Sequence, residues 1–136
     1  MKVGIIGSGS MGSGIAQVAA TFGHEVKLFD TNTAALEKAK ASYEKIFNRL
    51  IEKGKYTIDQ KNEIIGRISF STSMKDFSDC GLVIEAIVEN IEVKKSVFSE
   101  LETIVSDGCI LASNTSSLSI ASIAAACEKS DRVIGI

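Results

Sequence analysis

The sequence has little of what marks a nucleic-acid-binding or membrane protein. Its 15 lysine and arginine residues stand against 17 acidic ones, so a net charge of −2 gives no electrostatic basis for binding nucleic acid or an anionic membrane. No apolar run approaches the roughly 20 residues that cross a bilayer, and the N-terminus lacks the zones of a signal peptide. We therefore expect a cytoplasmic protein that binds neither nucleic acid nor membrane.

Cysteine and histidine are also scarce. The three cysteines, Cys80, Cys109 and Cys127, are far apart, form no C-x-x-C pair and have no histidine near them. This pattern argues against a metal site and a disulfide framework, so we interpret them as small buried hydrophobic residues. The single histidine, His24, falls in a loop at the sheet edge opposite to the one that binds ligands in doubly wound folds, and we do not expect it to be a catalytic base.

A glycine-rich motif near the N-terminus is the most informative feature present. An apolar strand pattern over residues 2–6 leads directly into G-x-G-x-x-G, and a helix-competent stretch follows. In this order Gly7 permits a sharp turn, Gly9 lets a pyrophosphate approach the backbone, and Gly12 lets the helix pack closely. The helix N-terminus then binds the phosphates without a basic side chain. The predicted cofactor-binding residues of this loop are Gly7, Ser8, Gly9, Ser10, Met11 and Gly12.

An acidic residue completes this fingerprint. A second strand is predicted over residues 25–29, and Asp30 follows it at about the spacing at which an acid reaches the adenosine ribose. A carboxylate there accepts hydrogen bonds from the ribose and repels a 2′-phosphate, so the sequence favours NAD over NADP. Alternatively, Asp30 is only a turn or cap residue before residues 31–33.

Strands and helices alternate along the rest of the chain. Apolar residues at helical spacing predict a long helix over residues 36–50, capped at Thr31 or Asn32 and ending near Gly54. A shorter helix is predicted over residues 58–65. Since this helical insertion after the second strand is longer than a crossover needs, we expect it to be functional. The other predicted elements are strands over residues 67–70, 82–85, 109–112 and 132–136 and helices over residues 92–104 and 119–127.

This pattern predicts an α/β protein with a doubly wound, mostly parallel sheet, the Rossmann fold, in the strand order 3-2-1-4-5-6. We expect residues 1–136 to form a single domain. The last predicted strand stops at the final residue, and residues at such strand ends commonly carry chemistry. The chain is therefore expected to be a piece of a longer protein.

Two further polar segments follow strands at the same predicted edge as the glycine loop. One is residues 85–90 with Lys94 a helical turn later, and the other is residues 113–117. Each segment alone fits a helix cap or a turn. Their position beside the glycine loop favours a functional role.

On these residues the chain resembles the N-terminal domain of the 3-hydroxyacyl-CoA dehydrogenase family, and within it the 3-hydroxybutyryl-CoA dehydrogenases. The matching stretches are residues 6–16, 83–90 and 110–118, and the last is the most specific because general dinucleotide-binding domains do not share it. The resemblance implies that the parent enzyme transfers hydride between L-3-hydroxyacyl-CoA and NAD. It also implies an acyl-CoA partner and a parent protein that is a homodimer or higher homo-oligomer.

The resemblance also implies individual roles. Glu89 and Lys94 would contact the nicotinamide end of the cofactor, Ser116 would act in catalysis by hydrogen bonding to the reacting oxygen, and Lys53 would pair with the CoA phosphates. The family has a serine in place of Ile46. Further cofactor contacts implied by the resemblance are Ala86 and Asn114.

The family's general base is a histidine in a His-Phe-Phe-Asn-Pro motif that would begin right after residue 136, and a helical domain for substrate binding and dimerisation follows it. Neither lies within these residues. Two other functions fit the glycine loop and the ribose acid: another hydroxyacid dehydrogenase, and a non-catalytic NAD-sensing regulatory domain.

Overall fold

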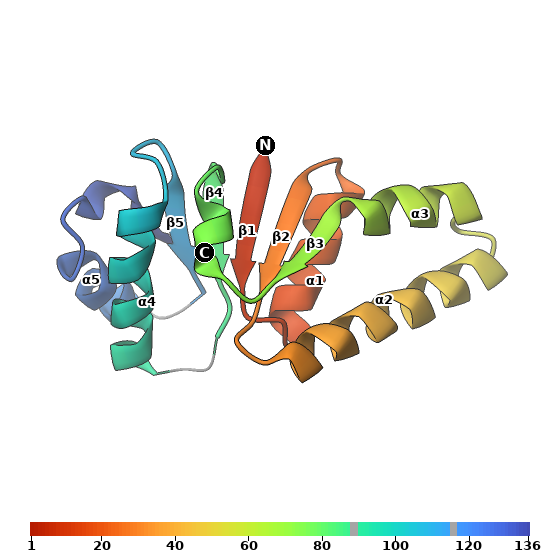
Figure 1. The fold of residues 1–136 in the computed structure, drawn as a ribbon, viewed down its shortest axis with the longest axis horizontal. Helices are drawn as coiled ribbons and strands as arrows, with labels where there is room; N and C mark the ends of the chain where they lie inside the picture. Colours follow the sequence, from red (N-terminus) through yellow and green to blue (C-terminus); the bar gives the residue numbers. More distant parts are fainter. Residues whose placement is uncertain (88–89, 115–116) are drawn as a thin grey trace.

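A parallel six-stranded sheet forms the centre of the described chain. The structure is a computed structural model that describes residues 1–87, 90–114 and 117–136. The strand order is β3-β2-β1-β4-β5-β6 and every neighbouring pair is parallel, as predicted. All carboxyl ends therefore meet at one edge, the lower edge in Figure 1. The strands are β1 (Lys2–Ile6), β2 (Glu25–Phe29), β3 (Ile68–Ser71), β4 (Leu82–Glu85), β5 (Ile110–Ser113) and β6 (Val133–Gly135).

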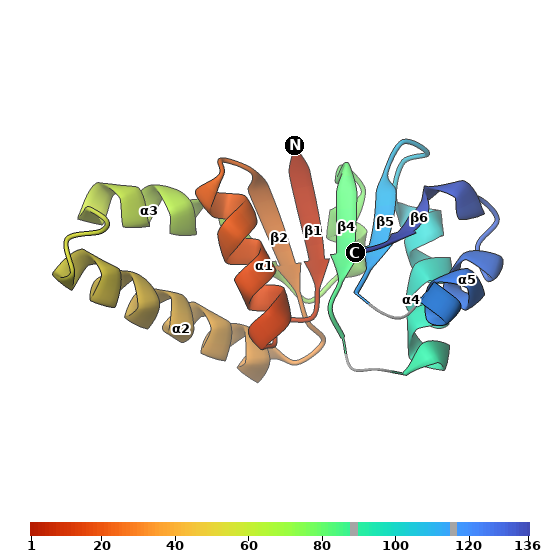
Figure 2. The ribbon, with the colours of Figure 1, turned by 180° about the vertical axis from the view of Figure 1, so that it is seen from behind.

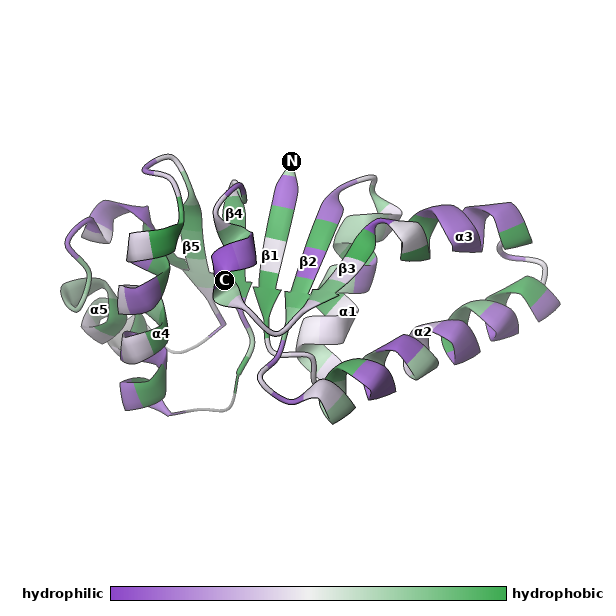
Figure 3. Ribbon diagram, viewed as in Figure 1, coloured by the Kyte–Doolittle hydropathy of each residue, from purple (hydrophilic) through white to green (hydrophobic). Residues whose placement is uncertain are grey.

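Helices cover both faces of this sheet. Helix α1 packs on one face, and η1 and α4 pack on the other (Figures 1 and 2). The alternation of side chains along β1 separates the two cores, since Val3 and Ile5 pack with α1 whereas Ile6 packs with η1 and α4. With both faces covered, the strands are predominantly hydrophobic (Figure 3). The helices are α1 (Ser10–Thr21), α2 (Thr33–Glu52), α3 (Ile58–Gly66), α4 (Ile91–Ile104) and α5 (Ser117–Ala125), with short 3-10 helices η1 (Met74–Phe77) and η2 (Ser130–Arg132).

Helices α2 and α3 form the predicted insertion and extend sideways from the sheet (Figure 1). The Asn32 side chain caps α2 by accepting from the N–H groups of Ala34 and Ala35, and Gly54 follows the helix at a φ of +73°. Both features agree with the sequence, because asparagine is a strong N-cap residue and glycine tolerates positive φ. We call α2 and α3 the helical arm, and its far tip, where α2 is joined to α3, lies to the side of the sheet and away from its carboxyl edge (Figure 1).

The predicted boundaries are off by a few residues. Strand β3 begins at Ile68 rather than Arg67, because Arg67 still caps α3 through its N–H. Strand β5 is shifted by one residue, β6 is shorter than predicted, and α5 begins two residues earlier. The single turns η1 and η2 were not predicted, since such short elements show no periodicity.

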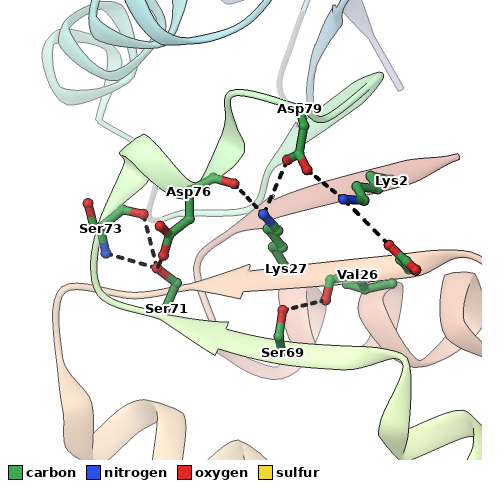
Figure 4. Close-up of polar contacts among 9 residues, drawn as sticks. Lys2, Val26, Lys27, Ser69, Ser71, Ser73, Asp76 and Asp79 are labelled. Atoms are coloured by element: carbon green, nitrogen blue, oxygen red, sulfur yellow. Dashed lines mark hydrogen bonds and ion pairs between the residues drawn. The ribbon is translucent and has the colours of Figure 1, made fainter.

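A polar cluster fixes η1 against the sheet. The Lys27 ammonium, on β2, donates to the Asp76 carbonyl at 2.7 Å and to Asp79 at 3.2 Å, and Asp79 also pairs with Lys2 of β1 (Figure 4). The hydrogen bonds from Lys2 and Lys27 lower the pKa of Asp79 to about 2. These pairs are solvent-exposed, so they position the segment more than they stabilise the fold.

The positions of the three cysteines and of His24 largely agree with the predictions from the sequence. Cys80 and Cys109 are buried and Cys127 is half-buried, and burial raises the pKa of the Cys80 and Cys127 thiols to about 11. His24 lies between α1 and β2, at the amino edge of the sheet. Within the described ranges no helix is long and apolar enough to cross a membrane.

Candidate functional site

The glycine loop joins β1 to α1 at the carboxyl edge of the sheet. Gly7 has a φ of +103°, a region that L side chains rarely adopt, and its N–H donates to the Phe29 carbonyl at 2.8 Å. A Cβ on Gly12 would lie 1.7 Å from the Gly7 carbonyl oxygen, so only glycine lets α1 approach the loop this closely. The sharp turn predicted at Gly7 and the close packing predicted at Gly12 are both confirmed.

Gly9 has a different environment from these two glycines. A Cβ built on it would meet nothing within 4 Å, so the space next to its backbone is open on the protein side. Gly9 is also the N-cap of α1, and no side chain caps this helix. The positive end of the helix dipole therefore faces the open space beside Gly9, the arrangement that binds phosphate in dinucleotide sites.

Asp30 lies at the end of β2 and connects to the glycine loop. Its carboxylate accepts hydrogen bonds from the N–H and hydroxyl of Ser8, at 3.0 and 2.8 Å, and from the N–H of Asn32 at 2.9 Å. Partial burial acts to raise the pKa of Asp30, but these hydrogen bonds outweigh it and the pKa is lowered. Asp30 is therefore ionised at neutral pH and lies beside the loop, as required of a carboxylate that accepts hydrogen bonds from the hydroxyls of a ribose.

A buried ion pair occupies the other half of this edge. Glu85, the last residue of β4, and Lys94, in the second turn of α4, are 0% and 1% exposed, and their charged atoms are 3.1 Å apart. The Ser113 hydroxyl, at the end of β5, donates to the same carboxylate. The structure thus places Lys94 at the predicted edge, but as a buried partner of Glu85.

The remaining predicted cofactor residues lie around the same edge. Ala86 continues from β4 and its carbonyl faces Gly7, while the Asn114 amide donates to the sulfur of Met11 across the loop. Ser10 begins α1 and is exposed. Glu89 and Ser116 lie outside the described residues, so the roles predicted for them stay predictions.

A cleft of about 500 Å³ opens between the glycine loop and α2. The α2 side chains of Lys38, Ser42 and Ile46 line it at four-residue spacing, opposite Ser8 and the start of α1. We did not single out Lys38 or Ser42 from the sequence, although their spacing on one face of a helix was visible there.

Lys53, which the sequence suggested for the CoA phosphates, is exposed at the C-cap of α2. As the C-cap of α2 it follows the end of that helix, and it is not among the residues that line this cleft. Its predicted role stays a prediction.

Comparisons with known proteins agree on one family. The sequence model of the NAD-binding domain of 3-hydroxyacyl-CoA dehydrogenases matches residues 2–136. The chain is 47% identical over its whole length to a probable 3-hydroxybutyryl-CoA dehydrogenase of Deinococcus radiodurans and 43% identical to a 3-hydroxybutyryl-CoA dehydrogenase of Clostridioides difficile. The crystal structure of the 3-hydroxybutyryl-CoA dehydrogenase of Escherichia coli superimposes on 99% of the chain with a TM-score of 0.95 and 38% identity.

These relatives are longer than the chain. It spans 49% of the Deinococcus protein, 48% of the Clostridioides protein and 29% of the Escherichia coli chain. The shared part includes the whole sheet, the glycine loop and the helical arm, so the comparison extends over every element described above.

Proposed function

The chain belongs to the 3-hydroxyacyl-CoA dehydrogenase family as an NAD-binding domain, and we propose that it is the cofactor-binding part of an enzyme that interconverts L-3-hydroxybutyryl-CoA and its 3-keto product. One observation carries the proposal. The space beside the Gly9 backbone is open for a pyrophosphate, and the ionised Asp30 carboxylate is hydrogen-bonded to the same loop. Bound NAD would supply the hydride acceptor, and NADH the donor in the reverse reaction.

Each part of the edge then has a task. The backbone of the glycine loop holds the pyrophosphate, Asp30 holds the adenosine ribose, and the β4 and β5 ends support the nicotinamide half. Ser116 donates a hydrogen bond to the reacting oxygen of the substrate. The cleft along α2, with Lys38 and Ser42, offers a cation and a hydroxyl to a phosphate-bearing ligand beside the loop. The parent protein is proposed to be a homodimer or higher homo-oligomer that binds acyl-CoA.

We expect the chain to bind NADH more tightly than NADPH. The Asp30 carboxylate repels a 2′-phosphate, and no arginine follows it to bind that phosphate. Replacing Asp30→Ala should weaken NADH binding roughly ten- to hundredfold, since a hydrogen bond to a charged group contributes about 1.5–3 kcal/mol. Titration of both cofactors by fluorescence measures this preference.

Asp30→Asn keeps the shape of the side chain and removes its charge, and it serves as the matched variant. NADPH should gain on NADH in this variant relative to the unmodified chain. Equal or tighter binding of NADPH by the unmodified chain would show that Asp30 is only a turn residue.

The role proposed for Ser116 needs the parent enzyme. There, Ser116→Ala should lower kcat by roughly two to three orders of magnitude, as loss of one oxyanion-type donor typically does, while NADH affinity stays within twofold. Steady-state kinetics together with an NADH titration separate the two effects. An unchanged kcat would leave Ser116 as a turn residue.

A further inference from the structure

The Glu85–Lys94 pair lies on the half of the site that the adenosine does not use. Glu85 is in register with Ile6 of β1 and with Ser113 of β5, so it ends its strand directly beside the glycine loop. Asp30 marks the adenosine half, on the β2 side of the loop. In a doubly wound sheet the dinucleotide crosses the carboxyl edge at β1 and β4, so its nicotinamide half lies over β4 and β5.

The Glu85 carboxylate joins three separate segments. One oxygen lies 3.1 Å from the Lys94 ammonium and accepts a hydrogen bond from the Ser113 hydroxyl, and the other accepts from the Ile87 N–H at 2.7 Å. These three partners belong to α4, to the end of β5 and to the turn that follows β4. Because the carboxylate is fully buried, a shift of any one segment would break a hydrogen bond or the ion pair, and water cannot replace either contact.

Fold stability does not account for this arrangement. Taking two charges out of water costs so much that a well-packed apolar pair is often as stable as a buried ion pair, or more stable. Every other ion pair between two described residues includes a side chain at least 12% exposed. The pair with both side chains buried is the one at the cofactor edge.

We propose that Glu85 is a positioning residue for the nicotinamide half of the site. It holds the Lys94 ammonium and, through Ile87 and Ser113, the two chain segments that form the floor beneath the nicotinamide. This inference rests on the proposed function, because it assigns the β4–β5 half of the edge to the nicotinamide.

The test compares NADH with ADP-ribose, which shares every part of the cofactor except the nicotinamide. Glu85→Gln removes the charge that faces Lys94. It should raise the Kd for NADH roughly tenfold or more and change the Kd for ADP-ribose less than twofold. Lys94→Met should do the same. NADH fluorescence titration, with ADP-ribose as competitor, measures both constants in the 136-residue chain.

The double variant Glu85→Gln/Lys94→Met separates positioning from stability. The glutamine oxygen can still accept a hydrogen bond from Ile87 or Ser113, and the contact between residues 85 and 94 is already lost in Lys94→Met. The double variant should therefore bind NADH no more weakly than Lys94→Met alone. Its melting temperature should rise above that of Glu85→Gln, because the buried Lys94 charge is then removed together with the Glu85 charge that faces it. If stability alone were at work, NADH affinity would recover together with the melting temperature.

Two further variants complete the test. Glu37→Gln removes a carboxylate from an exposed pair with Lys40 and should change neither Kd. Should Glu85→Gln fail to fold, Ser113→Ala removes one donor and keeps the carboxylate, and it should weaken NADH selectively. Equal losses for NADH and ADP-ribose, or an unchanged NADH affinity, would overturn the inference. If the unmodified chain bound neither ligand, the proposed function itself would fail instead.

Discussion

Mixed with acetoacetyl-CoA and NADH, the 136-residue chain is expected to oxidise the cofactor at least a hundredfold more slowly than an intact 3-hydroxybutyryl-CoA dehydrogenase, while still binding NADH. A positioned acid–base group contributes about 10²–10⁴-fold to such a reaction. The single histidine of the sequence, His24, lies at the amino edge of the sheet, opposite the glycine loop. The histidine that the family resemblance implies as the base is not among these residues.

The measurement follows NADH absorbance over time, with the Clostridioides relative assayed in parallel as the positive control. A fluorescence titration of the same preparation shows whether NADH is bound, so that lack of turnover is not mistaken for lack of folding. Orientation of the acyl group also contributes to the rate, and its loss would add to the loss of the base. Sustained turnover at the rate of the control would place the acid–base group within these 136 residues and require new roles for them.

The geometry of the glycine loop and of Asp30 could be predicted from the sequence because its signals are local. Gly7, Gly12 and Asp30 each act through backbone conformation or position at a strand end, and the strand–loop–helix order fixes both. The same holds for Asn32 and Gly54 at the ends of α2, where cap chemistry depends on one or two neighbours.

The other half depends on contacts between distant segments. Nothing in the spacing of Glu85 and Ser113 shows that their side chains meet, because the contact arises from pairing of β4 with β5. Lys94 could be assigned to the correct edge but not to a buried pair, since burial depends on how α4 packs. The role of Lys53 stays a prediction, since its place at the C-cap of α2 does not test whether it pairs with a CoA phosphate.

Replacement by alanine should have different effects at Gly9, Gly12 and Gly14, although Gly9 and Gly12 belong to the same G-x-G-x-x-G motif. Gly12→Ala should lower the free energy of unfolding by roughly 1–3 kcal/mol, the range for overpacked sites, because its Cβ would lie 1.7 Å from the Gly7 oxygen, where contacts under 3.0 Å do not occur. The loop carbonyl must therefore move by more than an ångström. A displacement of this size can cost about 10²-fold in function, and we expect NADH affinity to fall by about that factor.

Gly9→Ala should instead leave stability unchanged and weaken NADH at least tenfold, because its Cβ meets no protein atom and fills the space proposed for the pyrophosphate. Gly14→Ala is the matched control in α1, since its Cβ also meets nothing within 4 Å and alanine stabilises a helix by up to about 1 kcal/mol over glycine. Denaturant unfolding and NADH titration of the three variants give both quantities. Tight NADH binding by Gly9→Ala would mean that the pyrophosphate does not approach the backbone there, and the cofactor would have to be placed elsewhere along the edge.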